Sequence, residues 1–507
     1  MVRKVIVVGG GSAGFLAALA LKVKMPDLRV VVIRSKDIGI IGVGEGSTVP
    51  LTTFLHGYLR ADLRALFKLA QPTVKMGVKF INWSPRGHYY YPFGAQLDVC
   101  PNALERNIGF FCDDDLEDAT LEMAMISREK VFFRGRDGKP VVHNKFAYHI
   151  ENEKFVGYLE AFAQNQGVEI VEDTIGSVEQ DEAGVRELKL ASGRTESADL
   201  YVDCSGFVSL LLGKTLGEPY VSYRNSLFCD SAVIGGWERT TEPIHPYTTA
   251  EAFDSGWCWQ IEHVHRINRG YVYSSAFISD DDARREYLAK NPKVSGDTRV
   301  VRFKSGRYAR GWVKNVVAIG NASGFVEPLE ATALGLIAAR SQLVSQMLVE
   351  CNRQVVPFQV DLFNQSHGRL WDATRDFLAC HYRFNLHLKT AFWQHCRSET
   401  YIGRAGPMLD YYQEFGPTGM WGPLLVDSLD PFGSKGYLMI LVGQKVPYKS
   451  HYAASPREQQ AWAAIRRQNA EAADGAMTVL EALQAFGAAG VRVQQSSPVV
   501  VAHTAIR

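Results

Sequence analysis

The sequence predicts an α/β fold, because two apolar strands flank a glycine-rich turn and a helix at its start. Residues 4–8 form a short apolar run, the helix that follows is rich in alanine and leucine, and residues 29–33 form a second apolar run. Gly9, Gly11 and Gly14 stand between the first run and the helix. In such a unit the first glycine permits a tight turn, the second lets the backbone approach a pyrophosphate, and the third lets helix and strand pack closely. We therefore expect a dinucleotide at this turn rather than a plain loop.

The helix after the turn begins at Ser12. Its free amides and positive dipole end point at the expected pyrophosphate, so Ser12 and Ala13 join the three glycines as predicted ligands. A ribose-binding acid is expected at the end of the second strand, but Arg34 stands there. An arginine at that place favours a 2′-phosphate, or a nucleotide that is held less tightly. We include Arg34 among the predicted nucleotide contacts.

Length and composition limit the function classes. A chain of 507 residues that is 46% hydrophobic can bury a large core, and its length favours two or three subdomains. The formal net charge of +1 gives no basic field for nucleic acid or an anionic membrane, so we expect a small-molecule partner. The eight cysteines include no C-x-x-C pair, and a strand rather than a signal peptide occupies the first residues, which fits a reducing cytosol. The apolar runs are too short to span a bilayer. We expect a cytoplasmic protein without a membrane segment or a metal site.

A strap-like segment follows the second strand. Residues 40–50 are glycine-hinged, apolar and too irregular for a strand, which indicates a mobile cover over a ligand. This segment contains the run Gly42, Val43, Gly44 and Glu45. Placed soon after a glycine-rich first turn, the run resembles the flavin-dependent halogenases of the tryptophan and indole type. The resemblance implies that these four residues contact a flavin and link its site to the substrate.

Two lysines lie in the next matching segment, residues 72–83, which alternates like one half-buried strand. Their spacing of four predicts that Lys75 and Lys79 share one face of that strand. The motif T-x-K-x-G-x-x-F resembles the family's catalytic segment, and by this resemblance Lys75 is the catalytic lysine. We interpret Lys79 as an edge residue that extends to water.

Aromatic residues form the next two matches. Residues 88–94 resemble the family's aromatic stretch beside the substrate, and residues 257–261 resemble its W-x-W-x-I-P signature, with Glu262 in place of the proline. Either run taken alone is consistent with ordinary core packing. The flavin and substrate walls that the resemblance implies are Tyr91, Pro92, Phe93, Trp257 and Trp259.

The most specific match covers residues 316–335, an apolar strand, a glycine turn and a long alanine- and leucine-rich helix from about Ala333. It resembles the family's G-N-A-x-G-F-V-[DE]-P-L-E-S-T-G stretch. By that resemblance Glu330 is the second catalytic residue, and the amides of Thr332 and Ala333 cradle the halide. Ala331 and Ala333 replace the usual serine and glycine, which weakens the expected halide cradle. Further flavin contacts implied by the resemblance are Ile175, Gly320, Phe325 and Leu334.

These matches imply a glutathione-reductase/p-hydroxybenzoate-hydroxylase-like FAD-binding fold of the α/β (α+β) class. It would carry an inserted large β-sheet substrate region and a helical C-terminal subdomain. We expect an FAD-binding module over residues 1–340, with the insertion at about 60–150 and 215–312. Residues 341–507 would form the mainly helical subdomain that caps the substrate pocket.

The resemblance also implies the reaction. The enzyme would use FAD as FADH2, supplied by diffusion from a separate NAD(P)H-dependent flavin reductase, together with bromide or chloride. It would oxidise the halide to hypohalous acid, Lys75 would pass the halogen to an electron-rich aromatic, and Glu330 would stabilise the cationic ring or take its proton.

The substrate is the least determined part of this expectation. We expect free indole or a simple indole derivative, because no pair of groups for the charged ends of a free amino acid is recognised, and we expect bromide to be preferred. The oligomeric state is expected to be monomer or homodimer. The alternatives are a flavin-dependent monooxygenase or NAD(P)H oxidoreductase of the same fold, favoured by Arg34, Glu262 and Ala333, and a non-catalytic flavin-binding module.

Overall fold

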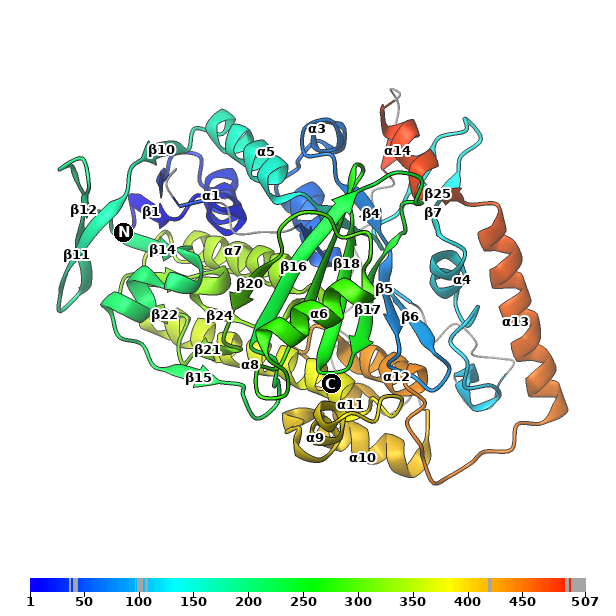
Figure 1. The fold of residues 1–507 in the computed structure, drawn as a ribbon. Coiled ribbons are helices and arrows are strands. Elements are labelled where there is room, and N and C mark those ends of the chain that lie inside the picture. The colour runs from blue at the N-terminus through cyan, green and yellow to red at the C-terminus, as the bar shows by residue number, and fades with distance from the viewer. Residues whose placement is uncertain are drawn as a thin grey trace, which may run out of the picture.

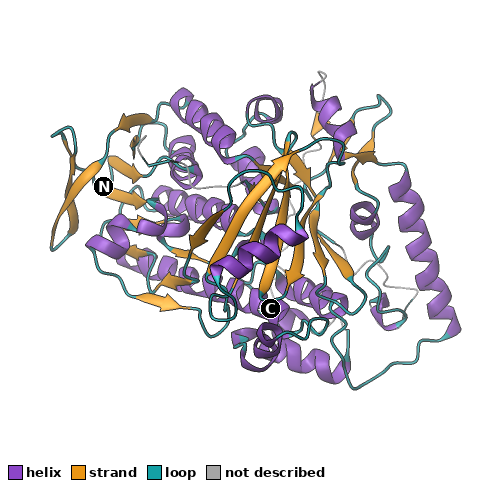
Figure 2. Cartoon of the chain, in the orientation of Figure 1, coloured by secondary structure: helices purple, strands orange, loops and turns teal. Residues whose placement is uncertain are grey.

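The computed structural model describes residues 1–35, 38–39, 44–95, 97, 104, 108–417, 422–487 and 492–493. Two large sheets form its framework, and helices pack around them (Figure 1, Figure 2). The first sheet contains the N-terminal strands, and the second is the long sheet at the centre of Figure 1, which is mostly green and includes two blue strands.

The first sheet carries the predicted nucleotide turn. Its order is β10–β2–β1–β14–β23–β22, and every pair is parallel except β22 with β23. These strands are β1 (Lys4–Val8), β2 (Arg29–Arg34), β10 (Glu169–Glu172), β14 (Leu200–Asp203), β22 (Trp312–Val313) and β23 (Val316–Ala318). Because β1 has parallel neighbours on both sides, the turn after it lies at the carboxyl edge of the sheet, where ligands bind in folds of this kind.

Both faces of this sheet are covered, which explains its nearly continuous apolar strands. Val5 and Val7 pack into one core with the helices α1 (Ser12–Lys24), α5 (Asn152–Asn165) and α7 (Ala333–Glu350). Ile6 and Val8 face the other way, into a core with the antiparallel strands β11 (Ile175–Asp181) and β12 (Gly184–Leu190), which β13 (Thr195–Glu196) extends.

The second sheet has seven strands in the order β20–β16–β19–β18–β17–β5–β6. They are β5 (Gly77–Ile81), β6 (His88–Pro92), β16 (Ser231–Glu238), β17 (Tyr247–Phe253), β18 (Gly256–Glu262), β19 (Arg266–Tyr273) and β20 (Arg299–Arg302). Strands from both predicted inserted segments therefore share one sheet. One face packs with the C-terminal helices, and α6 (Asp280–Lys290) covers part of the other.

A small sheet connects the end of the strap to the segment that contains Lys75. Its order is β3 (Glu45–Gly46), β9 (Ala147–Ile150) and β4 (Thr73–Lys75). The end of the strap, predicted to be irregular, therefore forms a short strand. Residues 72–83, predicted as one strand, form two strands in different sheets, because at Met76 the backbone switches partners to Pro246 and Phe93.

The C-terminal part is mainly helical. Its elements are α8 (Pro357–Arg383), α9 (Ala391–Glu399), α10 (Gly406–Phe415), α11 (Gly422–Leu425), α12 (Gly433–Gly443), α13 (Pro456–Asp474) and α14 (Val479–Gly487). Two short strands also return to the first half of the chain, since β25 (Met477–Thr478) pairs with β7 (Lys130–Arg134) and β26 (Arg492–Val493) pairs with β8 (Pro140–Val142). The other short elements are α2 (Val49–Thr53), α3 (Leu63–Leu69), α4 (Leu121–Ser127), β15 (Tyr220–Ser222), β21 (Gly306–Tyr308) and β24 (Gly324–Phe325).

Membrane-spanning helices and clusters of metal ligands are absent from the described residues. No described helix is long and apolar enough to cross a bilayer. Within the same part of the chain, no three or more histidine, cysteine, aspartate or glutamate side chains gather as metal ligands.

Candidate active site

The first turn has the geometry of a pyrophosphate site. Gly9 has φ 115°, and a Cβ there would lie 2.3 Å from the carbonyl oxygen of Cys204. A Cβ on Gly14 would lie 1.9 Å from the carbonyl oxygen of Gly9, so helix and strand touch at this point. Gly11, by contrast, has no described atom within 4 Å of an added Cβ, and no side chain caps α1 there. The uncapped amides at Ser12 and the open side at Gly11 fit an anionic ligand.

The second glycine turn lies beside the first. Gly320 has φ 70°, and a Cβ on it would lie 3.1 Å from the Cβ of Ala13. Phe325 in β24 stands edge-on to Phe207, which lies in the 3₁₀ turn after β14, with ring centroids 4.9 Å apart. Of the remaining predicted contacts, Leu334 is buried in the first turn of α7, whereas Ile175 is half-buried at the start of β11.

Arg34 is neutralised within the protein. It ends β2, and its guanidinium lies 2.6 Å from Glu160 of α5 and 3.6 Å from Glu172 of β10. A Cβ added to Gly10 would lie 2.5 Å from the Cβ of Arg34, so the arginine packs directly beneath the turn. Its charge is matched by carboxylates, an arrangement that does not favour a 2′-phosphate there.

The described end of the strap, from Gly44 onward, lies beside the predicted catalytic segment. Gly42 and Val43 lie outside the described residues. Gly44 has φ 87°, and Glu45 accepts a 2.5 Å hydrogen bond from the Asn152 side chain. A Cβ on Gly46 would lie 3.0 Å from Lys75 Nζ and 3.2 Å from the Cβ of Ala331. The end of the strap thus lies between the lysine and the predicted halide segment.

Lys75 is a fully buried amine that forms no hydrogen bond with any described residue. Its Nζ lies 5.3 Å from the ring centroid of Phe93. Burial lowers the pKa of Lys75 from 10.5 to about 7, and the negative charge of Glu330 partly opposes this effect. A buried amine with a pKa near neutrality is a typical functional group rather than a packing residue.

Lys79 has a different environment. Its Nζ lies 5.3 Å from the ring centroid of Tyr90 and 5.4 Å from that of Tyr247, and the residue is only half-buried. The expectation that the two lysines share one face is therefore wrong. The strand break at Met76 resets the alternation, so the side chains of Lys75 and Lys79 have separate surroundings.

Glu330 is fully buried at the end of the 3₁₀ turn Pro328–Glu330. Its Oε1 lies 2.8 Å from Nε2 of His381 in α8, a residue that the sequence reasoning missed. The His381 Nδ1 lies 3.0 Å from the carbonyl oxygen of Phe377. Glu330 and its histidine therefore form a buried pair, within which the negative charge of Glu330 raises the pKa of the lysine.

The predicted halide residues stand at the start of a long helix. Thr332 is the N-cap of α7 and Ala333 is its first residue, and no side chain caps this terminus. Ala331, just before them, has φ 54°. The left-handed backbone turns the chain sharply, and the uncapped amides of an 18-residue helix fit a small anion.

Trp257 and Trp259 line one face of β18, and both are buried. Trp257 Nε1 donates a 2.7 Å hydrogen bond to Glu327, which also accepts from the Tyr382 hydroxyl. Burial raises the pKa of Glu327 to about 7. The sequence reasoning did not assign this glutamate, although it lies three residues before Glu330.

The remaining aromatic wall lies on β6 and just after it. Tyr91 packs against Phe377 of α8 with ring centroids 6.0 Å apart, Pro92 ends the strand, and Phe93 faces the lysine. Glu262, which replaces the family proline, is buried in an ion pair with Arg239.

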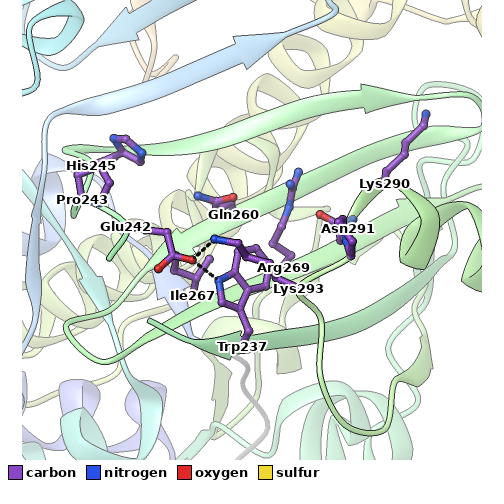
Figure 3. Close-up of a pocket in the computed structure, with 11 residues that line it drawn as sticks. Trp237, Glu242, Pro243, His245, Gln260, Ile267, Arg269, Lys290, Asn291 and Lys293 are labelled. Carbon is purple, nitrogen blue, oxygen red and sulfur yellow. Dashed lines mark hydrogen bonds and ion pairs between the residues drawn. The ribbon is translucent and has the colours of Figure 1, made fainter. Parts of the chain in front are cut away.

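Two cavities adjoin the large sheet. One of about 330 Å³ is bounded by Trp237, Gln260, Arg269 and Asn291, near the end of α6 (Figure 3). Gln260 alternates with Trp259 along β18, so this cavity lies on the face opposite the tryptophans. The other, about 200 Å³, is bounded by β6 and the turn before it, by the end of α12 and the residues after it, and by α4 and the loop before it. Its lining residues are Arg86, His88, Tyr89, Tyr90, Asp114, Asp115, Leu116, Glu117, Met123, Val442, Gly443 and Lys445.

The family is decided by a match over nearly the whole chain, because the model of the tryptophan halogenase family covers residues 4–486. The chain belongs to this family. It is a flavin-dependent halogenase, an enzyme that uses FAD in its reduced form and a halide, and that relies on a separate flavin reductase. The predicted FAD-binding α/β fold with a helical C-terminal part is confirmed.

Relatives of this halogenase include tryptophan 6-halogenase ThaL of Streptomyces albogriseolus, 32% identical over 420 residues and 78% of each chain. Tryptophan 7-halogenase RebH of Lentzea aerocolonigenes is 32% identical over 421 residues, again 78% of each chain. Among solved structures, MibH, a lanthipeptide tryptophan 5-halogenase, is 38% identical with a TM-score of 0.87, covering 96% of this chain and 94% of the other. BrvH from Brevundimonas sp. BAL3 is 28% identical with a TM-score of 0.83, covering 96% and 99%.

Proposed function

We propose that this halogenase transfers electrophilic halogen from Lys75 to the ring of an indole substrate, and that Glu330 receives the ring proton. The observation that supports this most directly is the unpartnered, fully buried amine of Lys75, with a pKa of about 7, acting within the field of Glu330. An amine of this pKa is largely neutral in mildly basic solution, so it offers a lone pair that ordinary surface lysines lack.

The cofactor would be held by the two glycine turns. The amides at Gly11, Ser12 and Ala13 would bind the pyrophosphate, and Gly320 would border the same cleft. Bound reduced FAD, with oxygen, supplies the oxidising equivalents that convert halide into hypohalous acid. The uncapped start of α7 at Thr332 and Ala333 would hold the halide as an anion.

Lys75 would receive the hypohalous acid after it passes the strap at Gly46, the glycine that a Cβ would bring to 3.0 Å from Nζ. The lysine either hydrogen-bonds the oxidant or carries the halogen as a haloamine. In both cases burial keeps the oxidant out of bulk water, into which it would otherwise diffuse away from the site. The ring would then attack the halogen, and the Glu330 carboxylate would stabilise the cationic ring and take its proton.

The substrate proposal is an indole ring that carries a polar part, such as tryptophan alone or within a peptide. The expectation of free indole rests on the sequence, in which no residues are recognised that would bind the charged ends of a free amino acid. The 200 Å³ cavity favours a polar substrate, because it is lined by Tyr89, two residues before Tyr91 of the aromatic wall on β6, and by Arg86, Asp114 and Lys445. Charged groups of both signs suit an amino acid or a peptide backbone, and the named relatives act on tryptophan.

A single assay separates the candidate functions. The protein is incubated with a flavin reductase, FAD, NADH and bromide or chloride, and with indole, tryptophan or a short tryptophan peptide, and the products are read by mass spectrometry. A halogen isotope pattern supports the proposal, and the ranking of the three substrates decides between free indole and a polar indole. A gain of one oxygen would indicate a monooxygenase, and unchanged substrates would indicate a non-catalytic flavin protein.

A further inference from the structure

His381 carries no assigned role, yet it contacts the proposed base directly. It lies in α8, and its side chain is fully buried, as is that of Glu330. The distance from His381 Nε2 to Glu330 Oε1 is 2.8 Å, and that from His381 Nδ1 to the Phe377 carbonyl oxygen is 3.0 Å. Both ring nitrogens are therefore within hydrogen-bonding distance of an oxygen.

These contacts determine how many protons the pair holds. A carbonyl oxygen only accepts, so His381 Nδ1 must carry a hydrogen to bond Phe377. The contact between Nε2 and Oε1 then needs exactly one further proton, either on the imidazole or on the carboxyl group. In both arrangements the pair is electrically neutral, which lowers the free-energy cost of burying Glu330 in a region of low dielectric.

The surroundings hold the imidazole in this orientation. The ring of Phe80 lies 5.0 Å from that of His381, centroid to centroid, and Trp83 packs edge-on at 6.1 Å. Gln444 donates a 2.8 Å hydrogen bond to the backbone carbonyl oxygen of His381. Glu330 Oε2 forms no hydrogen bond with a described residue, so this second oxygen is available to a ring proton, whereas Oε1 is committed to the histidine.

We propose that His381 is the positioning residue that lets Glu330 act as a base, by taking up the positive charge that the halogenated ring gives up. This inference rests on the proposed function. When the ring C–H bond breaks, its electron pair restores aromaticity and the proton goes to Glu330 Oε2. The pair then carries one proton on Glu330 Oε2 and one on His381 Nε2, in addition to the hydrogen on Nδ1. The positive charge that the ring loses therefore resides on the imidazolium of His381. The overall change replaces a ring hydrogen by halogen and turns hypohalous acid into water.

The test compares two buried histidines of the same helix. His367 is also fully buried in α8 and bonds a backbone carbonyl, that of Tyr308 at 3.1 Å, but no carboxylate. We expect His381→Gln to lower kcat for halogenation about 10- to 100-fold, as loss of acid–base assistance does, with the KM for the aromatic unchanged. Trapping of hypohalous acid by an added 1,3-diketone should stay at the native rate. His367→Gln should retain native kcat.

A substrate deuterated on the ring gives the decisive readout. In the native enzyme proton loss is fast, so the rate should not change with deuteration, whereas in His381→Gln it should become rate-limiting and show a primary isotope effect. A merely structural defect would lower kcat without that effect, and such a result would overturn the proposal. Equal behaviour of the two histidine variants would also overturn it.

Nitrogen NMR of the native enzyme with labelled histidine tests the same idea without a variant or turnover. We expect His381 to show a protonated Nδ1 and an Nε2 that shares its proton with Glu330, and we expect Glu330→Gln to shift the Nε2 signal toward the unprotonated form. An unprotonated Nδ1 in the native enzyme would overturn the proposal. If no aromatic is halogenated at all, the proposed function fails, and this spectrum still decides whether the proton pair exists.

Discussion

Replacing Lys75 by methionine should abolish halogenation and at the same time stabilise the fold. Methionine keeps the length of the side chain and removes the amine that delivers halogen, so we expect product formation to fall at least about 100-fold. The stability gain follows from burial, which lowers the pKa of Lys75 from 10.5 to about 7. A pKa shift of that size means that folding destabilises the protonated form of Lys75 by about 5 kcal/mol.

The stability gained by removing Lys75 should depend on pH. Between pH 7 and pH 10.5 the unfolded chain binds the Lys75 proton and the folded chain does not, so the lysine lowers stability most at pH 7 and below, and the loss disappears as the pH approaches 10.5. Lys75→Met should therefore raise the free energy of unfolding by up to about 5 kcal/mol near pH 7, and by much less near pH 10.

The assay combines denaturant unfolding at several pH values with mass spectrometry of the halogenated product. Lys79→Met is the matched control, because Lys79 is half-buried over two aromatic rings and lies outside the proposed site. It should retain most of the activity. A Lys75→Met protein that is less stable than the native one near pH 7, or one that still halogenates, would refute the reasoning.

Three further predictions concern the cofactor turn, the strap and the halide. Arg34→Glu should weaken FAD binding and lower stability by about 1–3 kcal/mol, because it would add a third carboxylate beside Glu160 and Glu172, and flavin fluorescence titration with denaturant unfolding checks both effects. Gly46→Ala should cut halogenation about 10-fold or more while FAD still binds, because its Cβ would lie 3.0 Å from the reactive amine; native turnover would show that this contact is unimportant. Bromide should give more product than chloride when both are supplied equally, since bromide is easier to oxidise and the alanines before α7 make a poorer cradle; an excess of chlorinated product contradicts this.

The nucleotide half of the fold could be predicted from local patterns. An apolar strand, the glycines at positions 9, 11 and 14 and an apolar helix specify a parallel β–α–β unit almost without tertiary information, and the observed sheet has β1 between parallel neighbours. Arg34 shows the limit of that reasoning. Its position was predictable, but its partners Glu160 and Glu172 lie more than 120 residues away, so its neutralisation was not.

The candidate catalytic residues could be identified from the sequence only through motifs. Lys75 and Glu330 stand within recognisable runs, and the structure gives Lys75 the buried, unpartnered environment that a functional amine needs. The alternation of residues 72–83 wrongly predicted one face for Lys75 and Lys79, because the strands before and after Met76 belong to different sheets. His381 had no signal in a single sequence, since its partner lies 51 residues earlier and a lone histidine in a helix usually has no special role.

Halogen should reach the substrate only through Lys75. The most direct measurement is a parallel turnover of the native enzyme and Lys75→Met with a flavin reductase, FAD, NADH, bromide and a tryptophan-containing substrate, in which brominated product and trapped hypohalous acid are quantified together. We predict brominated product with its isotope doublet from the native enzyme, and from the variant an undiminished yield of trapped oxidant with no brominated product. Equal bromination by both proteins, or loss of the oxidant itself in the variant, would contradict the claim.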